Sequence, residues 1–162
     1  MTVGAGQQMS QTGRSWPLGA SVYDGGVNFS VYSRNASAVE LLLFDREDDA
    51  RPARVIPIEP VLHRTYHYWH NFVPCLRLGQ IYGYRIQGPN DPANGLRFDP
   101  AKVLLDPYGR GVVVPKNYSR DAARKAGDNA ATAMKSVVVD LSTYDWEGDL
   151  PTRFVPGDHS IK

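Results

Sequence analysis

Apolar and polar residues alternate over short runs through much of this 162-residue chain. Residues 27–33 alternate cleanly, and we expect Val27, Phe29 and Val31 to face inward. Residues 39–44 are more uniformly apolar, which predicts a strand covered on both faces. Further strands are predicted at residues 54–58, 66–73, 81–87 and 137–139. Short strands joined by Gly, Pro, Asn and Asp turns predict an all-β fold, an immunoglobulin-like antiparallel β-sandwich.

Residues 79–113 are the stretch around which we expect the rest to be organised. A strand is followed by three turn signals between Gly88 and Gly95. Asp99 and the proline after it can then start a short helical turn over residues 101–105.

The remaining segments set the expected domain limits. We predict a disordered leader at residues 1–14, a sandwich domain at 15–146 and a polar linker at 147–162. Inside the domain, residues 117–132 predict a surface excursion with at most a short helix. The acidic run at 45–50 predicts a solvated turn.

The net charge and the cysteine content limit which classes of partner and which compartment we expect. The formal net charge is +1, from 18 basic and 17 acidic side chains, which gives no reason to expect nucleic acid or an anionic membrane as partner. One cysteine excludes an internal disulfide and favours a reducing compartment, so we expect the cytoplasm. No run is apolar enough to span a bilayer, and residues 1–13 lack a signal-peptide pattern.

Several side chains invite a catalytic or metal-binding interpretation. Three histidines would share one face if the segment were a helix: His63, His67 and His70. The sequence around them alternates as in a strand, which separates His67 and His70, so we expect no metal site. Cys75 follows a proline in a turn and has no specified orienting group, which favours an idle thiol. No pair of carboxylates stands out as a glycosidase acid and nucleophile. We expect no cofactor.

Five ordered motifs carry a family resemblance. Residues 83–112 read GYRIQGPNDPANGLRFDPAKVLLDPYGRGV. The other four are PLGA at 17–20, GVNFS at 26–30, AVELLLFD at 38–45 and Trp69-His70. Together, from about Trp16 to Trp146, they resemble the N-terminal β-sandwich domain of isoamylase-type debranching enzymes of the α-amylase superfamily. Two mild departures are Asp99, where the family usually has asparagine, and Asn71 after the Trp-His pair.

The resemblance implies an accessory role. In that family the catalytic carboxylates lie on a following (β/α)-barrel of about 250 residues, so we assign no catalytic residue here. The implied partners are that barrel in the same polypeptide and an α-glucan such as glycogen, starch or a maltooligosaccharide. The candidate glucan-binding residues are Trp69, Tyr84, Arg85, Asn90 and Asn94. The candidate barrel-interface residues are Leu96, Arg97, Phe98, Asp99, Pro100, Lys102, Asp106, Pro107 and Tyr108, and we expect an exposed apolar patch on or beside them.

Alternatives remain open at this point. The chain would act as an autonomous glycogen- or starch-binding module if it presented exposed aromatic rings, although the tryptophan that related modules carry in the following loop has no counterpart between Gln87 and Pro100. Front domains of glycogen-branching and trehalose-releasing enzymes are similar. The strand pattern alone also allows an immunoglobulin-like interaction domain unrelated to sugars.

Overall fold

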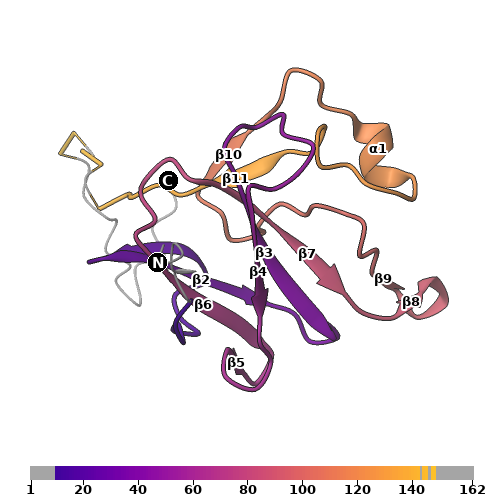
Figure 1. Cartoon of the computed structure of the whole chain (residues 1–162), viewed down its shortest axis with the longest axis horizontal. Coiled ribbons are helices and arrows are strands. Elements are labelled where there is room, and N and C mark those ends of the chain that lie inside the picture. Colours follow the sequence, from indigo (N-terminus) through magenta and orange to yellow (C-terminus); the bar gives the residue numbers. More distant parts are fainter. Residues whose placement is uncertain (1–9, 143, 146, 149–162) are drawn as a thin grey trace, which may run out of the picture.

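A computed structural model of the chain describes residues 10–142, 144–145 and 147–148. Two antiparallel sheets face each other, with the strand orders β1-β2-β6-β5 and β10-β11-β7-β3-β4, and a two-stranded ribbon β8-β9 extends from one side (Figure 1). The strands are β1 (Gly19–Tyr23), β2 (Gly26–Tyr32), β3 (Ala38–Phe44), β4 (Arg54–Ile58), β5 (Arg64–Thr65), β6 (Tyr68–Pro74), β7 (Ile81–Gln87), β8 (Asn90–Asp91), β9 (Leu96–Arg97), β10 (Gly111–Val113) and β11 (Lys135–Val137). The predicted antiparallel sandwich is confirmed.

The core between the sheets follows the period of two that the sequence shows. On β2, Val27, Phe29 and Val31 are at most 2% exposed, as the alternation predicts. Trp69 and Val73 on β6 lie directly across from β2 on the same face and are fully buried. The inter-sheet core is completed by residues such as Val39, Leu41, Leu43, Ile56, Ile58, Tyr82, Tyr84 and Val138.

Strand β3 is buried on both faces, as its uniformly apolar sequence predicts. Leu41 and Leu43 point into the inter-sheet core. Leu42 and Phe44 point to the other side of the sheet and form a second cluster. That cluster is completed by Val103, Ala130 and Ala133. The cover therefore comes from the segment after β7 and from the excursion that precedes β11.

The segment after Asp99 differs from its prediction. It makes only a turn at residues 100–101, in place of the helical turn expected over 101–105. Leu104 then pairs with Tyr84 of β7 through two backbone hydrogen bonds of 2.9 and 2.7 Å. The edge of β7 offers unpaired N–H and C=O groups beyond the end of β11, and satisfying them outweighs a single helical turn.

The excursion at residues 117–132 contains one short helix, α1 (Arg120–Arg124), as predicted. Ser119 caps it, because its side chain accepts a hydrogen bond from the Ala122 N–H. The last strand, β11, spans Lys135–Val137 and thus begins and ends two residues before the predicted strand at 137–139. Among the described residues, no helix is both long and apolar enough to cross a bilayer.

Part of the predicted leader contacts the sandwich. Gln11 pairs with Phe72 of β6 through backbone hydrogen bonds of 2.8 and 2.9 Å. The Arg14 backbone exchanges two hydrogen bonds with the Asn28 side chain. Residues 11–14 thus lie on the sandwich. The Gln11 backbone pairs with the backbone of β6, and the Arg14 backbone pairs with a side chain of β2. Residues 1–9 of the predicted leader, and all of the predicted linker except 147–148, lie outside the described residues.

Candidate functional site

Two of the predicted sugar-stacking rings are core residues. Trp69 is 0% exposed and Tyr84 is 1% exposed. The indole N–H of Trp69 donates to the Ser33 carbonyl at 3.1 Å, and the Arg64 guanidinium lies 4.7 Å from its ring centroid. Because stacking on a sugar needs a free ring face, neither ring is available in this position. The structure assigns both rings to packing.

The other predicted glucan-binding residues lie at the end of β7 and in the loop beyond it. The Arg85 side chain is about one quarter exposed, and its Nη1 lies 3.8 Å from a Glu40 carboxylate oxygen. Asn90 is exposed on β8. Asn94 donates to the Asp91 carboxylate at 2.6 Å. These groups could hydrogen-bond to sugar hydroxyls, and their role in glucan binding stays a prediction.

This loop lacks an exposed ring to complement its polar groups. Phe98 is half-buried and packs against the inter-sheet core. It lies directly over Gly88, where a Cβ would stand 2.6 Å from the Phe98 Cγ, so only glycine fits under the ring. The one aromatic residue of the loop therefore closes the core.

Asp106 anchors the segment that was predicted to form a domain interface. Its carboxylate accepts hydrogen bonds from the Tyr82 hydroxyl at 2.8 Å and from the Tyr108 N–H at 2.9 Å. Its own N–H donates to the Ser136 hydroxyl at 3.0 Å. Burial raises the pKa of Asp106, an effect that the two donated hydrogen bonds partly offset. Burial likewise raises the pKa of Tyr82, with the Asp106 carboxylate as a further cause.

Apolar side chains are exposed around this anchor. Leu104, Leu105 and Tyr108 are each 37–39% exposed. Leu104 and Leu105 line a groove of about 220 Å³, whose other lining residues are Lys102, Val103, Tyr118, Ala123, Asn129, Ala133 and Met134. We call this the docking groove. Exposed apolar side chains thus lie where the patch is expected, and their use as an interface stays a prediction.

The remaining predicted interface residues are distributed differently. Lys102 and Asp106 are buried, whereas Leu96, Phe98 and Asp99 are partly buried and Arg97, Pro100 and Pro107 are exposed. The Lys102 ammonium donates to the carbonyls of Ala122 and Gly127, both at 2.6 Å. Lys102 therefore holds the excursion in place behind the groove and does not present its charge to a partner.

A second lysine is buried, and its burial was not predicted from the sequence. Lys135 is 0% exposed, and its ammonium donates to the carbonyls of Glu47 at 2.6 Å and Ala130 at 2.5 Å. It also lies 4.7 Å from the Phe44 ring centroid. Burial lowers the pKa of Lys135, and nearby acids at 47–49 and Asp128 oppose that effect. Lys135 is the first residue of β11 and lies just before the apolar run 137–139, and this position was the available sequence signal.

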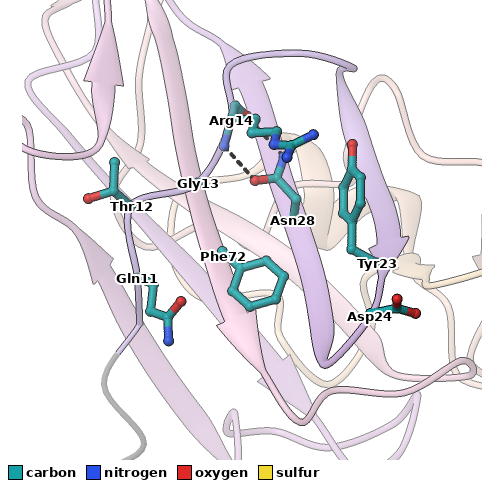
Figure 2. Close-up of a pocket in the computed structure, with 8 residues that line it drawn as sticks. All are labelled: Gln11, Thr12, Gly13, Arg14, Tyr23, Asp24, Asn28 and Phe72. Carbon is teal, nitrogen blue, oxygen red and sulfur yellow. Dashed lines mark hydrogen bonds between the residues drawn. The ribbon is translucent and has the colours of Figure 1, made fainter.

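A shallow pocket of about 270 Å³ lies where the N-terminal segment crosses β2 (Figure 2). The Asn28 side chain is occupied by the Arg14 backbone, as the dashed line in Figure 2 indicates. The Arg14 guanidinium lies 5.1 Å from the Tyr23 ring centroid. The polar groups of this pocket thus serve mainly to fasten the N-terminal segment.

The histidines and the cysteine form no catalytic or metal-binding group in the described part of the chain. No cluster of three His, Cys, Asp or Glu side chains suited to a metal occurs there. His63 and His70 are buried, and the His70 Nε2 lies 2.9 Å from the Thr65 hydroxyl. Burial lowers the pKa of His70, and His63 adds to the effect. Cys75 is exposed and free.

Relatives of known type match most of the length of this chain. A glycogen debranching enzyme of Serratia proteamaculans is 44% identical over 144 residues, which cover 83% of this chain and 20% of the relative. Isoamylase 1 of rice chloroplasts is 39% identical over 145 residues, covering 88% and 18%. The chain thus corresponds to about a fifth of the length of these relatives.

Solved structures share the fold. A pullulanase from Paenibacillus barengoltzii matches with a TM-score of 0.56 at 20% identity, over 88% of this chain and 18% of the pullulanase. The glycogen-degrading pneumococcal virulence factor SpuA matches with a TM-score of 0.57 at 18% identity, over 82% and 13%. Residues 17–109 also match the family described as carbohydrate-binding module 48 (isoamylase N-terminal domain). The resemblance of the ordered motifs is therefore confirmed, and the chain belongs to the carbohydrate-binding module 48 family, the isoamylase N-terminal domain.

Proposed function

We propose that this chain is the accessory N-terminal domain of a glycogen or starch debranching enzyme, in which it packs against a catalytic barrel and contacts α-glucan. The observation that carries the proposal is sequence identity of about 40% to debranching enzymes and isoamylases over 83–88% of the chain, together with the family match at residues 17–109, which includes the LLDPY motif. The reaction of the whole enzyme would be hydrolysis of α-1,6-glucosidic branch linkages. The domain itself is a non-catalytic module.

The docking groove supports the packing half of the proposal. Leu104 and Leu105 are exposed next to a buried anchor, Asp106, which fixes their backbone. The segment before β2 also lies beside this region, because Gly19 packs directly against the Tyr108 carbonyl. Trp16, three residues earlier in the chain, is exposed. Rigid, exposed apolar groups of this kind are typical of an interface between domains.

Compartment follows as a further part of the proposal. Cys75 is an exposed free thiol, and such thiols persist best where the surroundings are reducing. This fits the cytoplasm, which the single cysteine already favoured.

A chimaera tests the packing half. The chain would replace the matching N-terminal domain in the Serratia debranching enzyme, with Leu104→Asp and Leu105→Asp introduced together, and Leu62→Asp as the matched control. Leu62 is also exposed but lies in the loop before β5. We expect the unmodified chimaera and the control to debranch glycogen and to melt alike, and the double variant to melt lower. Equal melting of all three proteins would reject the docking groove.

A further inference from the structure

A row of aromatic rings lies on the outer face of the sandwich at the β5–β6 turn. It consists of Tyr32, Tyr66, His67 and Tyr68, which we call the hairpin surface. Tyr32 and Tyr68 pair across β2 and β6, with ring centroids 5.3 Å apart. The His67 ring lies 6.0 Å from that of Tyr32 and 3.8 Å from that of Tyr66. Tyr66 is 76% exposed and Tyr32 is 40% exposed, so the row is open to solvent.

The backbone at the tip of the turn is unusual for a tyrosine. Tyr66 has a φ of 57°, in the left-handed region that favours glycine or asparagine. Holding a bulky residue there costs about 1–2 kcal/mol, and this ring recovers little of that cost by burial. Since strained, exposed residues cluster at binding sites, the ring is better explained by contact with a ligand than by packing.

The turn is also held rigidly on the core. The Arg64 Nε donates to the Tyr66 carbonyl at 2.9 Å, while its guanidinium stacks on the buried Trp69 ring. The Arg64 Nη2 lies 3.5 Å from the His67 Nδ1. A ligand that meets these rings would therefore find them already ordered, which lowers the entropic cost of binding.

The chemistry of the hairpin surface suits a neutral, hydroxylated ligand. Across the described residues, none of the three tyrosine hydroxyls donates to a protein acceptor, so all remain available. Flat ring faces with free hydroxyls complement the apolar faces and hydroxyl edges of pyranose rings.

We propose that the hairpin surface binds an α-1,4-linked glucan chain, at a site separate from the Arg85 loop. This inference deepens the carbohydrate-binding half of the proposed function and rests on it. Figure 1 shows β5 at the opposite end of the molecule from α1, whose Ala123 lines the docking groove. Arg85 lies on β7 in the other sheet. A glucan on the hairpin surface would leave a docked catalytic domain undisturbed.

Binding of maltoheptaose, measured by isothermal titration calorimetry, and retardation by glycogen in native gels test this site. The main variant is Tyr66→Gly, which removes the ring and relieves the left-handed backbone, so its melting temperature should not fall. The matched control is Tyr118→Ala, a tyrosine of equal exposure to Tyr32 at the docking groove. Arg85→Ala probes the alternative loop. We expect Tyr66→Gly to weaken binding about tenfold, as loss of one ring contact implies, and Tyr118→Ala to bind like the wild type.

Each other outcome overturns the inference in a distinguishable way. If Arg85→Ala weakens binding and Tyr66→Gly does not, the glucan site lies in the β7 loop, and the proposed function stands without the hairpin surface. If the folded wild type binds neither glucan, the hairpin site and the carbohydrate half of the function both fail, while the chimaera still tests packing. If Tyr66→Gly abolishes self-association in sedimentation and leaves glucan binding intact, the surface is an interface between copies.

Discussion

Replacing Lys135 with methionine tests how the second apolar cluster and the excursion are held together. The change keeps the length of the side chain and removes an ammonium that donates to the Glu47 and Ala130 carbonyls. The buried Ala130 carbonyl would lose its partner, at about 1–3 kcal/mol. The partly buried carbonyl of Glu47 can turn to water and costs less.

Two smaller contributions complete the expected magnitude. Loss of the cation–π contact between Lys135 and Phe44 adds about 0.5–1 kcal/mol. Removing the cost of burying an ammonium offsets part of the total. We therefore expect Lys135→Met to lower the free energy of unfolding by about 2–3 kcal/mol.

Urea denaturation followed by tryptophan fluorescence measures this loss, because Trp69 lies in the core. Lys116→Met is the matched control, since Lys116 is an exposed lysine directly before the same excursion. Trypsin should also cut faster at Arg120 and Arg124 in the Lys135 variant, because the excursion loses one of its fastenings. A Lys135 variant as stable and as protease-resistant as the Lys116 variant would refute this account.

Three further changes have defined outcomes. Tyr82→Phe removes a hydroxyl from the buried Asp106 carboxylate and should cost about 1–3 kcal/mol in urea denaturation at pH 7; an unchanged midpoint would contradict the anchor. Trp69→Ala should cost about 3–5 kcal/mol, so any loss of glucan binding must be compared with folding measured by circular dichroism. Burial and His63 lower the pKa of His70 in the fold, so the unfolded chain binds that proton more readily. Stability should be full above the unfolded pKa of about 6.5 and fall below it, by at most about 1.4 kcal/mol per pH unit from this group. His70→Gln should flatten that slope, and parallel pH curves for wild type and variant would exclude His70.

The sandwich could be predicted because burial on one face imposes a period of two. Val27, Phe29 and Val31 show that period, and all three lie in the core. The uniformly apolar sequence of β3 correctly predicted burial on both faces. Leu41 faces the inter-sheet core, and Leu42 and Phe44 face the second cluster. What the pattern did not contain was the identity of the cover, because that depends on contacts distant in sequence.

The candidate glucan residues were harder to place for a related reason. A tyrosine or tryptophan on a strand has the same sequence signature whether its face meets the other sheet or the solvent. In the run Tyr66 to His70, the inward residue is Trp69, and the ring that reaches solvent belongs to Tyr66, whose left-handed backbone aims it outward. Register and turn geometry, both set by partner strands, decide between the two.

The two buried lysines show that a charged side chain can lie in the interior although its sequence suggests the surface. Lys102 was predicted to face a partner and Lys135 was passed over, yet both ammonium groups point inward to pairs of backbone carbonyls. The excursion has too few apolar residues to hold itself on the sheet, with no buried residue in α1. Its carbonyls are therefore fastened by charge-assisted hydrogen bonds. One wall of the docking groove is built this way, from Tyr118 to Met134.

This construction bears on how the two proposed surfaces could work in one enzyme. The hairpin surface is fastened to the inter-sheet core through Arg64 on Trp69, whereas one wall of the docking groove is fastened to the second cluster through Lys135, which contacts Ala130 and Phe44. Strand β3 contributes to both clusters, so the two surfaces, which lie on different sheets, are connected through the packed core. A glucan chain bound at the hairpin would thus be held at a fixed distance and direction from whatever docks at the groove. Rigid connection of this kind raises the effective concentration of one polymer segment near a second site, without any conformational change in the domain.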